Sequence, residues 1–347
     1  MPRTALVTAA NGYIGAAVSR AFVRAGYRVY GLIRRASSAP PLAQAEVIPI
    51  IGTLDDLSFL DSVPLTTVDV IVNCLEAFPN YEELSAKVMA LMTTLAKTSN
   101  VNGVKPLVLW SSGSKDYGTS PLHGDPELKP HTEESPLRPP MEAVRFRFET
   151  ALRIFDETYH QNLFDGVVLR PTNVYGYSSS YYAGMLEYAE KGKVKGKDVL
   201  TLVADPNTPL HALHVDDCAD AYVALAEHHD RAAVAGQAFN IASHRYETTL
   251  EVGEALAKEY GYSGGVRFTS DTEGDDDAST VDILFKFPQW VGSDKLRKLT
   301  GWHDKRMLWS ENLTAYRLAY EAERANGHEN IELSLKRLGA LRPAVKK

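Results

Sequence analysis

The sequence predicts an α/β fold in which a doubly wound parallel sheet is joined to a smaller C-terminal α/β lobe. Three observations support this prediction. An apolar run at 5–7 is followed by a tight polar turn and then by a segment, 15–23, with apolar residues at helical spacing. The mostly apolar run at 68–74 suits a strand that is buried on both faces of a parallel sheet. The segment 82–99 has the amphipathic pattern of a helix that covers such a sheet.

The turn after the first strand is the strongest functional signal in the chain. Its candidate cofactor-binding residues are Ala9, Asn11, Gly12, Tyr13, Ile14 and Gly15. Backbone N–H groups at the start of a helix that follows such a turn can hold a pyrophosphate. Gly12 lets a ligand approach the backbone, and Gly15 lets the helix pack close to the strand. The alternative interpretation is an ordinary strand-to-helix turn.

This turn resembles the TGxxGxxG motif of the short-chain dehydrogenase/reductase superfamily, in its extended branch of epimerases and dehydratases. The resemblance covers nearly the whole chain and implies a Rossmann-type sheet that binds a dinucleotide. It includes 214–221, which is similar to HVDDxAxA and starts a helix whose first acidic residues we interpret as structural. The family's first glycine is Ala9 here, and we expect its methyl group to narrow the turn without abolishing cofactor binding.

The composition limits the function classes that the chain can have. The 347 residues are 44% apolar and 23% charged, which is typical of a soluble globular protein. A net charge of −7 argues against a nucleic-acid partner, and no apolar run reaches membrane-spanning length. Because the first predicted strand starts so early in the sequence, we expect no signal peptide, and with two cysteines we expect no disulfide framework. We therefore expect a cytoplasmic protein.

The end of the second strand predicts the choice of cofactor. In this type of fold a carboxylate at that position binds both ribose hydroxyls of NAD. The predicted strand 29–33 ends in Ile33 instead, and Arg34 and Arg35 follow it. Arginine can bind a 2′-phosphate through paired, charge-assisted hydrogen bonds. The sequence therefore favours NADP over NAD, with a solvated basic loop as the alternative.

The resemblance implies further cofactor contacts along the edge of the sheet. The positions that match the family's cofactor-binding residues are Thr53, Leu54, Cys74, Leu75, Ser111, Pro171, Asn173 and Val174. Thr53 replaces the aspartate of the family's Gly-Asp-Leu, so the contact with adenine is altered. Leu75 and Glu76 replace two alanines beside the pyrophosphate, where a carboxylate is unfavourable unless it turns away or is paired. In contrast, 170–176 is close to the family's LRPxNVYG.

The segment after the predicted strand 106–110 resembles the family's Ser-Ser-x-x-Val-Tyr-Gly at the catalytic edge of the sheet. Counted from the strand, Ser112 matches the serine that donates a hydrogen bond to the substrate oxygen. Counted back from Tyr117, the match falls on Gly113, with Ser114 as the neighbouring hydroxyl. We favour Ser112 because strand ends fix geometry better than loops do. The alternative is a serine-rich turn without chemistry.

The family's Tyr-x-x-x-Lys pair is absent from the predicted helix 141–159. Depending on the register, Met141 and Arg145, or Ala143 and Arg147, stand at the two positions. In the family the tyrosine transfers a proton and the lysine lowers its pKa. Arginine can hold the cofactor ribose but is always protonated. We therefore expect Arg145 to supply fixed positive charge.

The proton donor is then expected elsewhere, on Tyr175, Tyr177, Tyr181 or a water molecule near Ser112. Of these, Tyr175 joins Ser112 and Arg145 as the third catalytic candidate. The candidate substrate-contacting residues are Glu76, Ser114, Tyr177, Tyr181, Tyr182 and Phe285. Packing between domains is the alternative role for the tyrosines. His123 and His131 lie in what we interpret as a solvated loop, so we expect no metal site.

The substrate class is narrowed by what the chain lacks. Sugar-nucleotide members of the family carry an arginine four residues before the histidine of HVDD, and this position is Leu210. The region of a second such arginine is acidic, at 273–277. We therefore expect an NADP-dependent oxidoreductase or epimerase of secondary metabolism that acts on a small apolar or aromatic oxygenated metabolite. The alternatives are a non-redox isomerase, lyase or cyclase that keeps a bound dinucleotide, and a cofactor-sensing regulator.

The order of the motifs predicts how the chain is divided. The cofactor domain comprises 1–174 and receives about 211–242, and the substrate lobe comprises 175–210 and 243–325. The tail, 326–347, is expected to be partly disordered. The resemblance implies a homodimer, because extended members of the family often dimerise through the two helices that match 82–99 and 141–159. On the second of these helices, one face of the sheet need not cover completely an apolar stripe formed by Val144, Phe148, Leu152 and Phe155.

Overall fold

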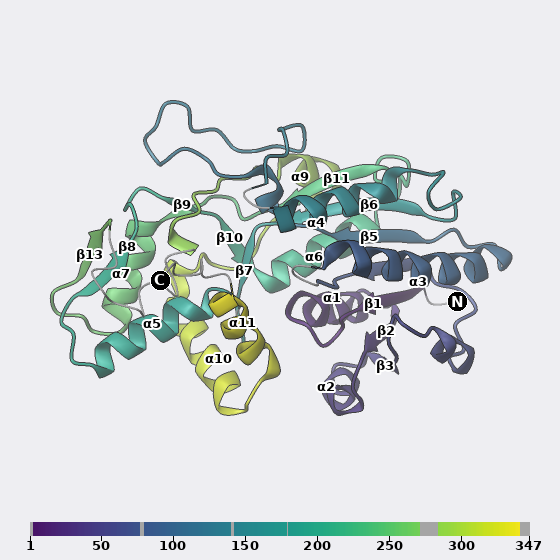
Figure 1. Ribbon diagram of the computed structural model, residues 1–347, viewed down its shortest axis with the longest axis horizontal. Coiled ribbons are helices and arrows are strands. Elements are labelled where there is room, and N and C mark those ends of the chain that lie inside the picture. The colour runs from purple at the N-terminus through teal and green to yellow at the C-terminus, as the bar shows by residue number, and fades with distance from the viewer. Residues whose placement is uncertain (1–2, 77–79, 140–141, 179, 271–283, 341–347) are drawn as a thin grey trace.

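The computed structural model describes residues 3–76, 80–139, 142–178, 180–270 and 284–340. Its main sheet has seven strands in the order β11-β6-β5-β4-β1-β2-β3 (Figure 1). These strands are β1 (Thr4–Thr8), β2 (Arg28–Ile33), β3 (Ile48–Ile51), β4 (Val70–Asn73), β5 (Leu107–Ser111), β6 (Asp165–Pro171) and β11 (Gln237–Ile241). Every neighbouring pair is parallel, so the predicted doubly wound parallel sheet is confirmed.

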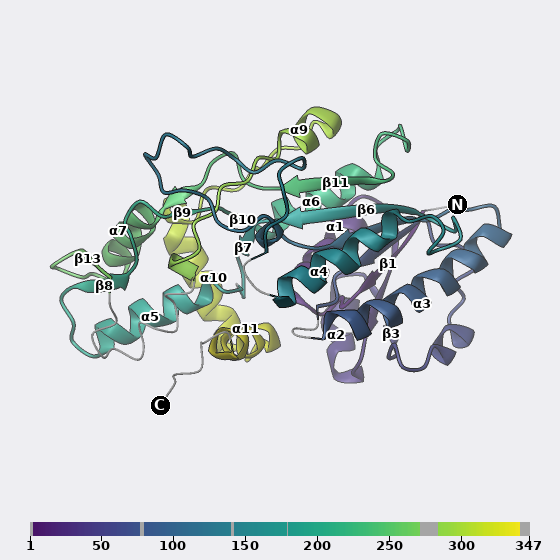
Figure 2. The same cartoon turned by 45° about the horizontal axis from the view of Figure 1, so that its top comes forward.

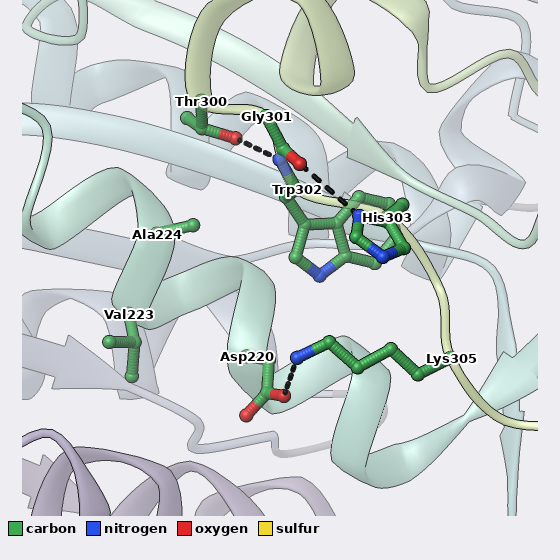
Figure 3. A pocket seen from close by; sticks show the side chains of 8 residues that line it. All are labelled: Asp220, Val223, Ala224, Thr300, Gly301, Trp302, His303 and Lys305. Carbon is green, nitrogen blue, oxygen red and sulfur yellow. Dashed lines mark hydrogen bonds and ion pairs between the residues drawn. The ribbon is translucent and has the colours of Figure 1, made fainter.

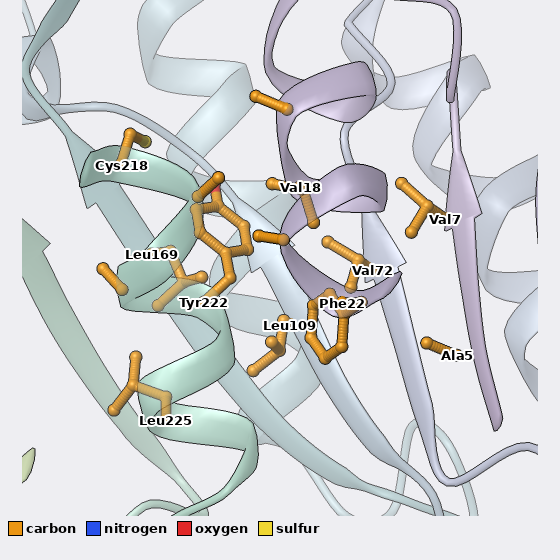
Figure 4. Packing of buried hydrophobic residues seen from close by; sticks show 14 of the residues in the cluster. Ala5, Val7, Val18, Phe22, Val72, Leu109, Leu169, Cys218, Tyr222 and Leu225 are labelled. Atoms are coloured by element: carbon orange, nitrogen blue, oxygen red, sulfur yellow. The ribbon is translucent and has the colours of Figure 1, made fainter. Parts of the chain in front are cut away.

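Helices cover both faces of this sheet, as Figure 2 shows. One face is covered by α1 (Tyr13–Arg24), α2 (Ala39–Gln44), α6 (Val215–Ala226) and α9 (Asp294–Thr300). The other face is covered by α3 (Tyr81–Val101), α4 (Glu142–Leu152) and the 3₁₀ turn η4 (Arg153–Phe155). Val7 lies in the hydrophobic cluster on the first face (Figure 4). Leu6 lies in the cluster on the second face, so neighbouring residues of β1 are both buried and apolar.

The C-terminal half builds a second hydrophobic cluster beside the sheet. Its helices are α5 (Ala183–Val194), α7 (Thr249–Glu259), α10 (Leu313–Ala325) and α11 (Glu329–Ala340). Three strand pairs accompany them, β7 (Asn173–Tyr175) with β10 (Ala212–His214), β8 (Leu200–Val203) with β13 (Val266–Thr269), and β9 (Pro209–Leu210) with β12 (Glu247–Thr248). The predicted division of the chain into a cofactor domain and a lobe stays a prediction.

Two helix ends differ from the sequence-based prediction. The helix expected at 141–159 ends with η4, because the Asp156 carboxylate accepts hydrogen bonds from the backbone N–H groups of Thr158 and Tyr159. The helix expected from Leu308 begins at Leu313, after the 3₁₀ turn η5 (Ser310–Asn312).

The predicted C-terminal tail contains a helix. The region 326–347 contains α11, and Ile331 on this helix is buried in the lobe core. Burial of an apolar side chain gives the helix a tertiary anchor that local sequence does not reveal. The acidic residues at 273–277 lie outside the described residues, as do 341–347.

Candidate active site

The carboxyl ends of β1 and β4 meet where the strand order of the sheet reverses. Ligands of doubly wound sheets bind in the crevice at such a point. The helix α1 begins there with Gly12 as its N-cap, and no side chain caps it. A helix N-terminus that no side chain satisfies can accept an anionic ligand on its backbone N–H groups. These features fit the pyrophosphate of a dinucleotide.

The turn between β1 and α1 needs its glycine at position 15. A Cβ atom on Gly15 would lie 2.2 Å from the carbonyl oxygen of Ala9, so no larger residue fits. Ala9 itself has a φ of 49°, in the left-handed region that favours glycine. The left-handed backbone conformation explains why the family has glycine at this position. Ala9 adopts the same conformation at an energetic cost.

The residues after β4 close the other side of the crevice. The backbone N–H of Cys74 donates to the Thr8 hydroxyl, and its Sγ lies 3.7 Å from the Oγ of Ser111. Burial raises the pKa of the Cys74 thiol to about 12, so it stays protonated and unreactive at neutral pH. Glu76 accepts a 2.8 Å hydrogen bond from the hydroxyl of Tyr81, which gives this carboxylate a partner.

The two arginines after β2 have different surroundings. Arg34 is exposed, and within the described residues it has no ion-pair partner. Arg35 forms an ion pair with Glu329, at the start of α11. Asn11 donates to the hydroxyl of Ser38 in the same loop. One of the two guanidinium groups is thus available to a ligand and the other is already paired.

The remaining predicted cofactor contacts lie along the same edge. Thr53 forms an isolated bridge with Asp56, and the side chain of Leu54 packs against the core. Pro171 ends β6, and Asn173 and Val174 lie in β7, which continues into the lobe. The contacts of these residues with a cofactor remain predictions.

A buried charge network lies beneath the segment after β5. Asp116 is fully buried in η3 (Ser114–Tyr117), and the Oγ of Ser112 donates to its Oδ2 at 2.6 Å. The guanidinium of Arg147 donates to the Oδ1 of the same carboxylate, also at 2.6 Å. The Ser112 hydroxyl hydrogen is therefore directed at Asp116, and its oxygen keeps lone pairs that can accept a hydrogen bond.

The structure corrects the expectation for Arg145. Its side chain is exposed and contacts Glu142 and Glu149 on its own helix. Arg147 is the arginine that faces the Ser112 segment, and its guanidinium nitrogens lie 3.1–3.2 Å from where a Cβ of Gly113 would be. A side chain at position 113 would therefore compete with Arg147 for the same space. Met141 lies outside the described residues.

Arg170, Tyr117 and Asn240 make further contacts that support the buried charge network. The Nε of Arg170 lies 3.4 Å from the Oδ2 of Asp116, and its Nη1 donates to the hydroxyl of Tyr117. That hydroxyl donates to the side-chain oxygen of Asn240 on β11. Two arginines thus lie against one buried carboxylate and supply its counter-charge.

Ser114 has a structural role in this arrangement. It is buried, and its hydroxyl donates to the Oε1 of Gln289 at 2.6 Å. The Nε2 of Gln289 donates in turn to the carbonyl oxygens of Ser114 and Gly118. Gln289 therefore holds η3 from the C-terminal half of the chain. Because its hydroxyl is occupied, Ser114 is not placed as a substrate contact.

Lys115 is a residue that the sequence analysis missed. Its Nζ lies 5.1 Å from the ring centroid of Phe287 and 5.7 Å from that of Tyr181. Burial, reinforced by the charge of Arg147 and opposed by Glu76, lowers the pKa of Lys115 to about 8. The sequence signal for Lys115 was a charged residue within the segment that contains Ser112. Its aromatic neighbours are distant in the chain, so the sequence did not reveal them.

The aromatic candidates are divided between the site and the lobe core. Tyr175 is buried and its hydroxyl donates to the carbonyl of Met307, and burial raises its pKa. Tyr182 and Phe285 are also buried in the lobe core. Tyr177 donates to Asp216 at the start of α6. The structure therefore places Tyr175 as a core residue rather than as a proton donor beside Ser112, and only Tyr181 lies near Lys115.

A surface pocket of about 280 Å³ lies elsewhere, between α6 and the segment 300–305 (Figure 3). Asp220 and Lys305 form an ion pair across it, and it shares no residue with the Ser112 network. Within the described residues, no group of three or more histidine, cysteine, aspartate or glutamate side chains could hold a metal ion. No helix in the same ranges is long and apolar enough to cross a membrane.

The sequence matches a known protein family and individual enzymes. The model of the NAD dependent epimerase/dehydratase family matches residues 5–242. UDP-glucose 4-epimerase from Mycolicibacterium smegmatis is 26% identical over 218 residues, which cover 62% of this chain and 62% of that enzyme. The chain thus spans less than two thirds of that relative. UDP-glucose 4-epimerase 2 from Oryza sativa is 24% identical, covering 94% of this chain and 86% of its own.

Solved structures share the fold at low sequence identity. dTDP-glucose 4,6-dehydratase from Bacillus anthracis in complex with NAD has a TM-score of 0.70 and 18% identity, covering 93% of this chain and 98% of its own. UDP-glucuronic acid 4-epimerase from Bacillus cereus in complex with NAD has a TM-score of 0.67 and 19% identity, covering 92% and 99%.

Proposed function

Because this chain belongs to the NAD dependent epimerase/dehydratase family, we propose that it is an NADP-dependent oxidoreductase or epimerase. Its substrate in this proposal is a small apolar or aromatic oxygenated metabolite of secondary metabolism, in the cytoplasm. The observation that carries the proposal is the uncapped N-terminus of α1, which lies at the switch point of the sheet beside the Ser112 network. Such a position binds dinucleotides in this type of sheet.

The residues present fit the cofactor along its whole length. The turn around Gly12 and Gly15 would hold the pyrophosphate, and Arg34 would bind the 2′-phosphate of NADP. Arg147 would hold the nicotinamide ribose, since its guanidinium lies against Gly113 at the edge of the sheet. When bound, the cofactor supplies the oxidising or reducing equivalent for the reaction. NAD complexes of the fold neighbours support dinucleotide binding but not the preference for NADP.

Ser112 would orient the substrate oxygen by accepting rather than donating a hydrogen bond. Its hydroxyl hydrogen is directed at the fully buried Asp116. A substrate hydroxyl could then donate to the Ser112 oxygen, which fixes the alcohol form for oxidation. This reverses the direction of the hydrogen bond that we expected from the sequence.

An apolar or aromatic substrate is supported by the surroundings of the site. The rings of Tyr181 and Phe287 lie on the side of Lys115 that faces the lobe. Leu210, at the position of the diphosphate-binding arginine of sugar-nucleotide enzymes, is buried in β9. Two relatives are named as UDP-glucose 4-epimerases, but a buried leucine offers no charge to a diphosphate.

The test begins with cofactor binding, measured by calorimetry with NADPH. Gly12→Ser places a hydroxyl that can cap α1 at the proposed pyrophosphate site, so we expect NADPH affinity to fall at least tenfold. Ala25→Ser, at the other end of α1, is the matched control and is expected to bind NADPH normally. Equal affinity of the two variants would contradict the proposed site.

The catalytic edge is tested by comparing two arginines on one helix. Ser112→Ala is expected to lower turnover by roughly tenfold to a thousandfold, because an oriented hydrogen bond to the substrate is lost. Arg147→Gln should lower it by a similar factor, whereas the exposed Arg145→Gln should leave it within about twofold. Equal losses for both arginine variants would contradict the site.

A non-redox isomerase, lyase or cyclase is the second candidate. The observation in its favour is that Arg147 and Lys115 place two cations at the sheet edge, where an enolate could be stabilised without redox chemistry. A product that is isomeric with its substrate, formed without net loss of NADPH absorbance, would favour this candidate. Stoichiometric loss of NADPH with product would favour the first.

A further inference from the structure

Lys115 is held in place by two neighbours that face away from it. Ser114 and Asp116, on either side in the chain, are buried and bound to Gln289 and Arg147. The Lys115 side chain lies instead between the sheet edge and the lobe, against the rings of Phe287 and Tyr181. Its backbone is therefore fixed by the Ser112 network, while its amino group reaches the side where we propose the substrate binds.

The surroundings of the Lys115 amino group combine apolar surface with few hydrogen-bond acceptors. Two aromatic rings lie within 6 Å of Nζ, and in the described part of the chain no carboxylate or carbonyl forms a hydrogen bond with it. The charged groups that influence it are Arg147 and Glu76, and the Glu76 carboxylate is already hydrogen-bonded to Tyr81. An ammonium without a fixed acceptor is free to give its proton to a ligand.

We propose that Lys115 is the catalytic residue that carries the proton between solvent and the substrate oxygen, in place of the missing tyrosine. The proposal rests on the proposed function. In the reductive direction, an N–H bond of the Lys115 ammonium breaks and an O–H bond forms on the carbonyl oxygen. The carbonyl carbon gains one hydrogen and an electron pair from NADPH, the reductant already named. Lys115 is left as a neutral amine and is reprotonated by water, and oxidation reverses each step.

The protonation equilibrium of Lys115 supports this role. Burial and the nearby charge of Arg147 disfavour the ammonium and bring its pKa to about 8. A proton carrier is most effective when its pKa lies near the working pH, because both of its forms are then populated. The phenol of Tyr81 is a poorer candidate, since burial raises its pKa and its hydroxyl already donates to Glu76.

The first experiment measures the titration of Lys115 in the whole protein without any substrate. Lysines are converted to ¹³C-dimethyl-lysines by reductive methylation, and their NMR shifts are followed against pH. The signal of Lys115 is assigned by its absence in Lys115→Arg, and the exposed Lys298 is the internal reference. We expect Lys115 to titrate well below Lys298. A titration of both residues together would overturn the proposal, whatever the activity.

The second experiment uses turnover of benzaldehyde with NADPH and of benzyl alcohol with NADP. Lys115→Met should lower kcat at least a hundredfold and remove the inflection near pH 8 from the profile of alcohol oxidation. Lys115→Arg should not restore the rate, because arginine keeps its proton. Lys298→Met is the matched control and should behave as wild type.

Failure of the proposed function and failure of the Lys115 role give different experimental results. Wild-type protein that binds no NADPH would overturn the proposed function itself. Wild-type protein that turns over benzaldehyde, with Lys115→Met retaining both its rate and its inflection near pH 8, would overturn only the role of Lys115. Recovery of full activity in Lys115→Arg would also overturn it, because a fixed charge would then be sufficient.

Discussion

Arg147 and Asp116 form a buried ion pair in which the guanidinium donates to the carboxylate at 2.6 Å, directly beneath the edge of the sheet. No more than 16% of either side chain is exposed. The pair forms where Gly113 provides space for the guanidinium. It joins the segment after β5 to α4, and so connects the sheet edge to the helix on which the family carries its catalytic residues.

We expect Asp116→Asn to destabilise the fold. The substitution leaves Arg147 and Arg170 close together without their shared counter-charge, which typically costs about 3–5 kcal/mol when a buried pair is broken. The free energy of unfolding in urea measures this loss. Asp61→Asn, at an exposed position, is the matched control and should change stability by no more than about 0.5 kcal/mol. Equal stability of the two variants would show that the pair is not structurally important.

Lys115→Met should stabilise the protein at neutral pH. The pKa of Lys115 is lowered to about 8 in the folded state, so folding disfavours its charged form. This destabilisation is complete below pH 8 and disappears as the pH rises through the unfolded-state pKa of about 10.4. The stability difference between Lys115→Met and wild type should therefore be largest at pH 7, decrease from about pH 8 upward and level off above the unfolded-state pKa of about 10.4. A difference that does not depend on pH would contradict the lowered pKa.

Ala9→Gly should not weaken the protein, although glycine usually does. Ala9 has a φ of 49°, which costs an L-residue about 1–2 kcal/mol, while the extra unfolded-state entropy of glycine costs about 0.5–1 kcal/mol. We expect a gain of up to about 1 kcal/mol by thermal or urea unfolding. Ala16→Gly, within α1, is the control and should lose about 1 kcal/mol. A loss at position 9 that equals the loss at position 16 would mean that the turn is not strained.

NADPH should bind at least tenfold tighter than NADH, a difference of about 1.4 kcal/mol. Arg34 is the exposed guanidinium that can bind the 2′-phosphate, so Arg34→Ala should remove most of this preference. Calorimetry with both cofactors measures it. Arg28→Ala, at the exposed start of β2, is the control and should keep the preference. Equal or reversed affinities in the wild type would show that the protein uses NAD.

The ion pair between Arg35 and Glu329 leads to a separate prediction. Glu329 competes with a 2′-phosphate for the guanidinium, so Glu329→Gln should tighten NADPH binding several-fold and leave NADH binding unchanged. The effect should decrease at high salt, because both side chains are partly exposed. Glu332→Gln, also in the first turn of α11, controls for changes in helix charge. Equal tightening of both cofactors would exclude competition at the phosphate.

A homodimer through α3 and α4 stays a prediction of the sequence. The two helices lie side by side on one face of the sheet (Figure 2), and Phe148 and Phe155 remain partly exposed there. Light scattering at micromolar concentration should give the mass of two chains. Phe148→Glu should give the mass of one chain while NADPH binding is kept. A wild-type monomer would rule the dimer out.

The sequence by itself determined the sheet and the cofactor turn, because both depend on local patterns. The centres of the first and fourth strands, 5–7 and 70–72, are apolar at every position, as strands covered on both faces must be. The need for glycine at position 15 also follows from one short turn, in which any Cβ would meet the carbonyl oxygen of Ala9. These features involve neighbours in the chain, so their residue types are sufficient to predict them.

Only the tertiary structure decided which side chains meet at the edge of the sheet. Residues 145 and 147 are separated by about 200° of rotation and so lie on nearly opposite sides of a helix. A shift of two residues in register therefore exchanges a solvent-facing arginine for one that pairs with Asp116. The surroundings of Lys115 depend on Tyr181 and Phe287, which only the packing of the lobe against the sheet brings near it. Local sequence cannot specify such contacts, because burial and charge at one residue are set by neighbours that are distant in the chain.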